Sequence, residues 1–160
     1  MSAEFRIRRA VQSDLEPLLD LLIRNKRLNE EFDPMLSTSS EIRSAAHKYL
    51  SEALSDPKSL VLVAEDHRGK MLAFLKADLI ERVFYSPEGE GVIREFYVLP
   101  EYRRKGLGKL MIDAAVKELV EMGAGIITAE FPSQHKIAVT FYESIGFRPL
   151  FSKYAKELTK

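Results

Sequence analysis

One run of this chain joins a predicted strand to a predicted helix: Val98-Leu99-Pro100-Glu101-Tyr102-Arg103-Arg104-Lys105-Gly106-Leu107-Gly108-Lys109-Leu110. The apolar segment 92–99 is strand-like and leads to the proline, and apolar residues recur at helical spacing from 107 to 122. Gly106 and Gly108 leave little side-chain bulk at the start of this helix. Free N–H groups and the positive end of the helix dipole attract anions there, so we predict a phosphate-binding turn.

The turn also carries four cations, which suit a ligand with several phosphates: Arg103, Arg104, Lys105 and Lys109. The turn is not a P-loop, because Leu110 stands where that motif needs Ser or Thr, and it lacks the three glycines of the dinucleotide fingerprint. The alternative is that the two glycines merely begin a helix. A glycine inside the first turn costs about 1 kcal/mol relative to alanine, so we disfavour that interpretation.

The spacing Arg103-x-x-Gly106-x-Gly108 is similar to the (Gln/Arg)-x-x-Gly-x-(Gly/Ala) motif of the GCN5-related N-acetyltransferase (GNAT) family. The segment 95–103 looks like the strand and loop that precede this motif in the family. A second run, Ala138-x-x-Phe141-Tyr142-Glu143-x-x-Gly146-Phe147, looks like the family's next signature. The resemblance extends over essentially the whole chain. It implies that the turn binds the pyrophosphate of acetyl-coenzyme A (acetyl-CoA).

Composition sets limits on the class of protein. The 160 residues favour a single domain, residues 1–160, and the 46% hydrophobic and 30% charged residues are ordinary for a globular chain. The formal net charge of +0 gives no support for a nucleic-acid or membrane partner. The absence of cysteine excludes disulfides and a cysteine nucleophile, and the three histidines do not suggest a metal site. With no signal peptide evident, we expect a cytoplasmic protein.

The pattern along the chain predicts the order β-α-α-β-β-β-α-β-α-β, which is a mixed α/β (α+β) class with helices on both faces of the sheet. It is also the order of the GNAT fold, whose central sheet is mostly antiparallel. Strands are expected over 5–9, 60–64, 71–80, 92–99, 126–131 and 147–154. Helices are expected from about 15 to 23, 38 to 54, 107 to 122 and 135 to 144, with an irregular or lightly helical connection over 25–37.

The resemblance also implies where the cofactor binds. In the GNAT fold the strands over 92–99 and 126–131 separate, and the pantetheine arm of the cofactor lies between them. Tyr97 and Val98 would offer backbone groups to pantetheine. The phosphates would contact the turn, which comprises Arg103, Arg104, Lys105, Gly106, Leu107, Gly108 and Lys109. His135 stands where the family often has an asparagine that contacts the cofactor, and a ring nitrogen could make that contact instead.

Two residues are candidates for the chemistry. Tyr142 matches the position where the family commonly has a tyrosine near the cofactor sulfur, so it is the candidate proton donor; the alternative is a core aromatic. Glu95 is the candidate base, acting through water, because family members often carry an acid on this strand; the alternative is a solvent-facing strand residue. Glu130 on the neighbouring strand is a weaker rival to Glu95.

The predicted function is acetyl-CoA-dependent transfer of an acetyl group to a primary amine, by direct transfer in a ternary complex. The alternative is a non-catalytic acyl-CoA-binding module with the same fold. A small-molecule or peptide amine is the expected partner, and a homodimer stays open. The acceptor is not defined, but two acidic groups could attract a cationic amine. One lies between the first two helices and the other near the second hairpin: Glu30, Glu31 and Asp33, and Glu81, Glu88 and Glu90.

Overall fold

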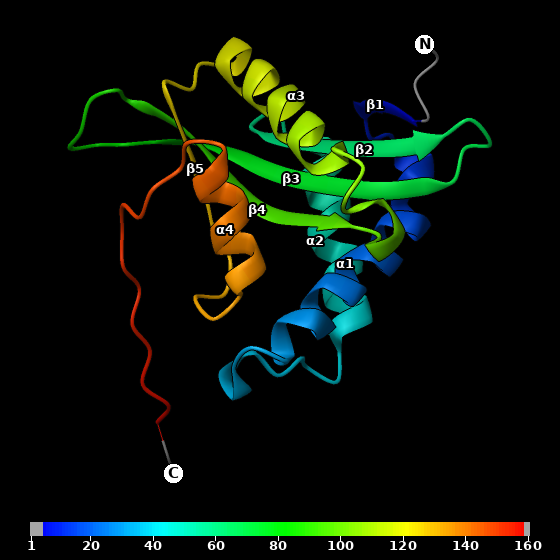
Figure 1. Ribbon diagram of the computed structural model, residues 1–160, viewed down its shortest axis with the longest axis horizontal. Coiled ribbons are helices and arrows are strands. Elements are labelled where there is room, and N and C mark those ends of the chain that lie inside the picture. The colour runs from blue at the N-terminus through cyan, green and yellow to red at the C-terminus, as the bar shows by residue number, and fades with distance from the viewer. Residues whose placement is uncertain (1–4, 159–160) are drawn as a thin grey trace.

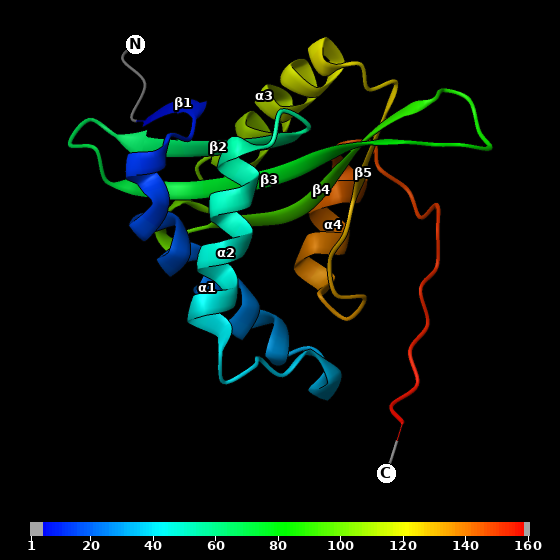
Figure 2. The ribbon, with the colours of Figure 1, turned by 180° about the vertical axis from the view of Figure 1, so that it is seen from behind.

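A central sheet carries two helices on each face in the computed structural model, which describes residues 5–158 (Figures 1 and 2). Helices α1 and α2 cover one face, and α3 and α4 cover the other. The elements in chain order are β1 (Phe5–Arg9), α1 (Leu15–Glu30), α2 (Ile42–Ser55), β2 (Ser59–Asp66), β3 (Met71–Glu81), β4 (Gly89–Val98), α3 (Leu107–Met122), β5 (Ile126–Ala129) and α4 (Lys136–Ser144). Three short 3-10 turns are η1 (Gln12–Asp14), η2 (Pro34–Leu36) and η3 (Pro100–Tyr102).

The strands follow the chain order β1-β2-β3-β4-β5 across the sheet. β1 to β4 pair antiparallel, and β5 pairs parallel to β4 after the crossover through α3. The middle strands are buried on both faces, as the continuous apolar run 60–64 indicates. The core joins both layers, with Leu18, Leu50, Phe74 and Met111 fully buried. The predicted mixed α/β class is therefore confirmed.

The sequence predicts most element boundaries well, because the apolar periodicity of each element matches its buried face. The helix predicted over 107–122 is α3 at the same bounds. The connection predicted to be irregular or lightly helical is regular helix over 25–30, where α1 continues to Glu30. This last part stays helical because Asn25 is buried and Leu28 packs on the core. Both residues therefore continue the buried face of α1 at helical spacing.

The predicted last strand over 147–154 is corrected by the structure. The Phe147 N–H donates to the Tyr142 carbonyl at the end of α4, and residues 148–158 are extended with no hydrogen bond to another element within residues 5–158. A strand needs a neighbouring strand for its backbone groups, and this segment leaves the molecule beside α4 without one (Figure 1). The strand-like composition is therefore present without its pairing partner.

A β-bulge bends β4 in the middle of the sheet. The register pairs Lys76 with Glu95 and Ala77 with Ile93, so Arg94 has no directly opposite residue on β3. Such an extra residue increases the local twist and changes the direction of the side chains around it. The bulge coincides with the place where β4 and β5 separate, and it positions the residues described next.

Candidate active site

β4 has an open edge beyond its pairing with β5. The parallel register ends at Ile93 and Ala129, and the last link is the Glu130 N–H donating to the Ile93 carbonyl at 3.0 Å. β4 continues to Val98, and only β3 pairs with residues 95–98 among the described strands. The separation expected between these two strands is thus seen in the structure. The open edge of β4 (residues 95–98) is a place where an extended ligand can make strand-like hydrogen bonds.

Backbone alternation decides which groups face the opening. The Leu99 N–H donates to the Leu72 carbonyl on β3 at 2.9 Å, so Leu99 and, two residues earlier, Tyr97 direct their backbone groups toward β3. Val98 directs its groups to the open edge, where its carbonyl accepts a hydrogen bond from Arg103 Nε at 2.9 Å. Tyr97 lies instead under the Arg103 guanidinium, 5.3 Å from ring centroid to Cζ. Of the two predicted pantetheine contacts, Val98 has the backbone orientation for it.

The glycine turn leads from η3 into α3. Gly106 has φ +79°, a left-handed conformation that favours glycine, and a Cβ there would meet no atom within 4 Å. Gly108 is close to α4, since a Cβ there would lie 3.3 Å from the Phe141 ring. The N–H groups of residues 106–109 make no backbone hydrogen bond within the described range, and they point out of the start of α3. The turn is therefore built to receive an anion.

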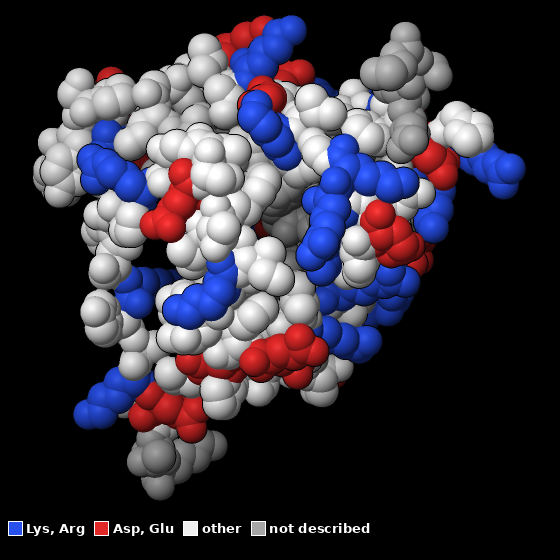
Figure 3. Space-filling view, in the orientation of Figure 1, with Lys and Arg blue, Asp and Glu red and all other residues white. Residues whose placement is uncertain are grey.

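Figure 3 shows the surface around this turn. A hollow lies near the middle of this face, between the start of α3 and α4, and Lys and Arg side chains gather along the side where Figure 1 places η3 and the turn. The basic residues of the turn, Arg104, Lys105 and Lys109, are solvent-exposed or partly so. Phe96 of β4 and Phe141 of α4 lie 6.1 Å apart between ring centroids. The site thus combines a cationic rim with aromatic packing between β4 and α4.

Glu95 is buried on the face of β4 that α1 and α2 cover. Only 7% of the residue is exposed, which rules out the solvent-facing alternative. Its Oε1 lies 2.6 Å from Lys26 Nζ of α1, and its Oε2 accepts a hydrogen bond from the Tyr49 hydroxyl of α2 at 2.9 Å. The Lys26 contact lacks hydrogen-bond geometry, and Oε1 is the one fully buried side-chain oxygen or nitrogen within residues 5–158 without a hydrogen bond. Oε1 of Glu95 is therefore held by the ion pair with Lys26 rather than by a hydrogen bond.

Tyr49 connects Glu95 to a second group of charges. Burial, with the nearby Glu95 charge, raises the pKa of Tyr49, so its hydroxyl stays protonated and donates. Lys76 Nζ lies 4.5 Å from the centre of the Tyr49 ring and 2.8 Å from Asp78. Burial opposes ionisation of Asp78, but hydrogen bonds from Lys76, Ser59 and Arg94 outweigh it and lower the pKa of Asp78. Tyr49 thus links Glu95, the acid near the opening, to the ion pair of Lys76 and Asp78.

Glu130 has a different environment. Its Oε2 accepts a hydrogen bond from Arg94 Nη1 at 3.1 Å, and its side chain is 61% exposed. A solvated carboxylate with a neighbouring guanidinium is a surface ion pair. The structure therefore favours Glu95 over Glu130 as the acid with a specialised environment.

Tyr142 lies in an aromatic cluster next to the opening. The residue is 6% exposed, and its ring stacks on Phe131, which follows β5, with centroids 5.0 Å apart. Phe141 and Phe147 contact its edges and face at 5.2 and 5.1 Å. The described residues give its hydroxyl no hydrogen bond, and this oxygen is not among the fully buried unpartnered atoms. The hydroxyl thus reaches accessible space, while burial raises the pKa of Tyr142 and keeps it protonated.

His135 begins α4. Its Nδ1 accepts a hydrogen bond from the Ala138 N–H at 3.3 Å, and its ring stacks on Phe32, with centroids 4.3 Å apart. Burial and the charge of Arg103 lower the pKa of His135, so the ring is neutral and Nε2 carries the proton. Nε2–H is the group left to contact a ligand. Phe32 therefore connects the segment after α1 to the start of α4.

Three of the acidic residues proposed near the acceptor make local hydrogen bonds, namely Glu30, Asp33 and Glu90. Glu30 accepts hydrogen bonds from Thr38, which fastens the segment between α1 and α2. Asp33 accepts from the Met35 N–H and caps η2. Glu90 accepts from the Thr128 hydroxyl across β4 and β5, and a hydrogen bond with Glu81, followed by the Glu81 charge, raises the pKa of Glu88. Sequence reasoning missed Lys26 and the role of Tyr49, for which a helical apolar pattern gives no signal.

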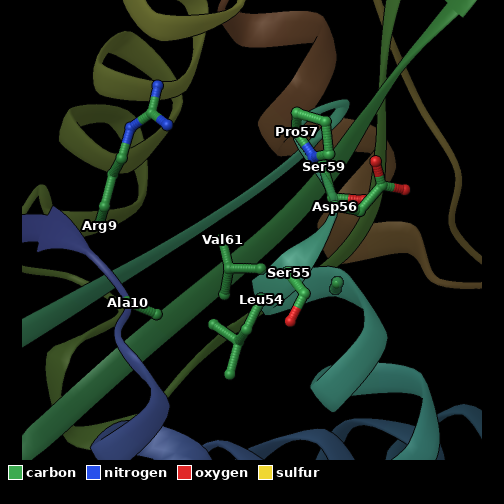
Figure 4. A pocket seen from close by; sticks show the side chains of 9 residues that line it. Arg9, Ala10, Leu54, Ser55, Asp56, Pro57, Ser59 and Val61 are labelled. Carbon is green, nitrogen blue, oxygen red and sulfur yellow. The ribbon is translucent and has the colours of Figure 1, made fainter.

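A separate hollow of about 250 Å³ lies near β1 and β2, at the opposite end of the sheet from β5 (Figure 4). It is lined by the end of β1, the end of α2 and the start of β2, including Arg9, Leu54 and Ser59. None of its lining residues is a predicted site residue. This hollow is therefore distinct from the site beside β4. A search of the described helices finds no segment long and apolar enough to span a membrane.

Comparison with known proteins agrees with this geometry. The model of the Acetyltransferase (GNAT) family matches residues 24–147. The chain is 29% identical over 79 residues to the [ribosomal protein bS18]-alanine N-acetyltransferase of Escherichia coli (strain K12), and the match covers 49% of each protein. It thus spans about half the length of that curated relative. It is 25% identical over 142 residues to an uncharacterized N-acetyltransferase of Archaeoglobus fulgidus, covering 89% of this chain and 92% of the relative.

The likeness in three dimensions covers the whole fold. The structure of aminoglycoside N-acetyltransferase AAC(6')-Iy in complex with CoA superposes with a TM-score of 0.78, covering 99% of this chain and 97% of that one. At 16% sequence identity, this match establishes the fold. The family match spans the glycine turn, the open edge of β4 and Tyr142 together. The chain belongs to the Acetyltransferase (GNAT) family.

Proposed function

We propose that this protein is an N-acetyltransferase that moves the acetyl group of acetyl-CoA directly to a primary amine. The observation that carries the proposal is the open edge of β4, which leads to the glycine turn and has Glu95 on one side and Tyr142 on the other. A module that only binds acyl-CoA has no need of a buried carboxylate beside this edge. Family membership supports the same activity.

The chain's own groups fit the chemistry of acetyl-CoA. Pantetheine carries amides, which suit the Val98 backbone groups at the open edge. The phosphates suit the N–H groups of residues 106–109, together with Arg103, Arg104, Lys105 and Lys109. Arg103 would have to share or release the Val98 carbonyl when a ligand pairs there. His135 would offer Nε2–H at the start of α4. Tyr97 contributes packing beneath Arg103.

The proposed reaction moves two protons, one from the amine to Glu95 and one from Tyr142 to the sulfur, and exchange with solvent then returns Glu95 and Tyr142 to their starting states. The neutral amine nitrogen forms a bond to the thioester carbon, and the carbon–sulfur bond breaks. Glu95, which is paired with Lys26 through Oε1, takes the proton of the amine through water. Tyr142 is protonated because burial raises its pKa, so its hydroxyl donates to the sulfur as the thiolate leaves. No covalent enzyme intermediate is needed, in line with the absence of cysteine.

The acceptor is proposed as a small-molecule or peptide amine. One relative is named for transfer to an alanine of ribosomal protein bS18, and a protein of the same fold is named for transfer to aminoglycosides. The acidic side chains near the opening, Glu95 and Glu130, would attract a cationic amine. The Phe32 and His135 stack would form part of the wall.

The experiment is a panel of amines incubated with acetyl-CoA, with acetylated products detected by mass spectrometry. The panel contains polyamines, amino acids, aminoglycosides and short peptides with an N-terminal alanine. Acetylation of one class by the native chain, and its loss in Glu95→Gln with CoA binding retained, would support the proposal. CoA binding without transfer to any amine would instead support the acyl-CoA-binding module.

A further inference from the structure

Lys26 of α1 brings a primary amine to the candidate base. Its Nζ lies 2.6 Å from Oε1 of Glu95, whose side chain is 7% exposed. Glu95 is also the first residue of the open edge of β4, and its side chain lies on the face that α1 and α2 cover (Figures 1 and 2). The proposed reaction needs an amine beside this carboxylate. The chain itself therefore supplies an amine at the proposed acceptor position.

Two other lysines that form ion pairs differ from Lys26 in what their amines contact. Lys76 is buried on β3, and its Nζ donates to both carboxylate oxygens of Asp78 at 2.8 Å. Lys109 pairs with Asp113 on the surface of α3, where its side chain is 64% exposed. The Lys26 side chain is 37% exposed, so it reaches both a buried carboxylate and solvent. Of these three amines, only that of Lys26 contacts the candidate base.

The surrounding contacts fix the carboxylate more firmly than the amine. Oε2 of Glu95 accepts a hydrogen bond from the Tyr49 hydroxyl at 2.9 Å. Oε1 is fully buried and has no hydrogen bond within residues 5–158, so Lys26 holds it by charge. Lysine carries its ammonium on a flexible four-carbon stem, so Nζ can shift without any movement of α1. The amine can thus reach an acetyl group at the open edge, while Oε1 is placed to take its proton.

We propose that Lys26 is a self-acetylation site: the chain transfers the acetyl group of bound acetyl-CoA to its own Lys26 Nζ when no external amine takes that place. This proposal rests on the proposed N-acetyltransferase function and adds an acceptor to it. A tethered amine needs no encounter step, so it reacts faster than a lysine elsewhere on the surface. An external amine would have to displace Lys26 from Glu95 before it could react.

The reaction balances with the groups already described. The Lys26 ammonium gives one proton to Glu95 and becomes a neutral amine. Its nitrogen forms a bond to the thioester carbon, the carbon–sulfur bond breaks, and the thiolate takes a proton from Tyr142. The acylated nitrogen loses its second proton to water, and exchange with solvent restores Glu95 and Tyr142. The products are acetyl-lysine, CoA and one proton.

Mass spectrometry of the native chain incubated with acetyl-CoA alone tests the proposal. Cleavage after acidic residues releases residues 21–30, in which Lys26 is the one lysine. Lys26 is expected to gain its acetyl group about tenfold faster than Lys109, an exposed lysine that reports the chemical background. Lys26→Arg keeps a positive charge beside Glu95 without a reactive amine, and it is expected to lose this acetyl group. Equal rates at Lys26 and Lys109 in the native chain would overturn the proposal.

Two variants separate enzymatic transfer from chemical acetylation. Glu95→Gln removes the proton acceptor, whereas Tyr142→Phe removes the proton donor and keeps both members of the Lys26–Glu95 pair. Each is expected to lower the rate at Lys26 about tenfold and to leave the rate at Lys109 unchanged. If circular dichroism shows that Glu95→Gln unfolds, Tyr142→Phe decides alone. An unchanged rate at Lys26 in Tyr142→Phe would overturn the proposal.

Dilution shows whether the transfer stays within one chain. The rate at Lys26 per chain is expected to be independent of protein concentration, and a rate that rises with concentration would overturn transfer within the chain. The panel of amines separates the failure of this proposal from failure of the proposed function. Transfer to an external amine without acetylation of Lys26 would overturn this proposal alone. Acetylation of neither would overturn both.

Discussion

Lys26 Nζ of α1 lies 2.6 Å from Oε1 of Glu95 on β4, in a protein whose open strand edge passes the same carboxylate. The pair joins two segments that are 69 positions apart in the sequence. Lys26 is 37% exposed at its side chain, whereas the Glu95 side chain is 7% exposed. An amine acceptor could therefore approach from the side on which Lys26 meets solvent. Lys26 is in a position to pair with Glu95 until then.

Replacing Glu95 and Glu130 in turn tests which of the two carboxylates is the base. Glu95→Gln keeps the shape but removes the proton acceptor, so kcat for acetyl transfer is expected to fall about 10²-fold or more. Glu130→Gln removes a solvated carboxylate of the same type from the neighbouring strand, and kcat is expected to stay within a factor of about three. Steady-state thiol release measures both. Equal losses in the two variants would assign Glu95 no special role.

Removing Lys26 separates positioning from catalysis. Lys26→Met leaves the buried carboxylate of Glu95 with the Tyr49 hydroxyl as its hydrogen-bond partner. We expect the free energy of unfolding to fall by about 2 kcal/mol, below the range for a fully buried pair because Lys26 is partly exposed. Chemical denaturation measures this change. The double variant Lys26→Met/Glu95→Gln is expected to recover part of the loss, and a further loss in it would contradict an ion-pair role.

Gly106 and Gly69 provide a matched pair for the glycine turn. Both have left-handed φ, +79° and +83°, and a Cβ at either position would meet no atom within 4 Å. Alanine at either site should lower the free energy of unfolding by about 1 kcal/mol. Only Gly106→Ala places a methyl group and strain at the proposed phosphate site, so only it should weaken CoA binding, about tenfold by calorimetry. Equal CoA affinities in the two variants would place the phosphates elsewhere.

Asp14 predicts a pH dependence of stability. The hydrogen bonds from Arg8, and then the Val11 N–H, lower the pKa of Asp14 despite its burial. Between the folded and the unfolded pKa of Asp14, the native state therefore binds fewer protons than the unfolded state. The stabilisation is present above the unfolded pKa of about 3.9 and is lost as the pH falls through the lower folded pKa. Asp14→Asn should be less stable at neutral pH and lose less on acidification, as thermal unfolding across pH would show.

The sequence was informative wherever one short segment determined its own structure. The periodicity of residues 107–122 and the left-handed conformation of Gly106 are local properties, so α3 and the turn could be predicted. The partners of Glu95 could not, because Lys26 and Tyr49 meet it only after two helices pack on the sheet. The bulge at Arg94 also defeats simple alternation along β4. The segment 147–154 has strand composition, but composition cannot say whether another strand lies beside it to accept its hydrogen bonds.

The most direct test of the central claim is thiol release from acetyl-CoA by the native chain and Tyr142→Phe, measured together with CoA affinity. Tyr142→Phe removes only the hydroxyl, which makes no hydrogen bond within residues 5–158, so folding and CoA binding should be unchanged. If Tyr142 donates to the departing thiolate, kcat should fall about 10²-fold while the CoA dissociation constant stays the same. An unchanged kcat in Tyr142→Phe, or no thiol release by the native chain with any amine, would contradict the account.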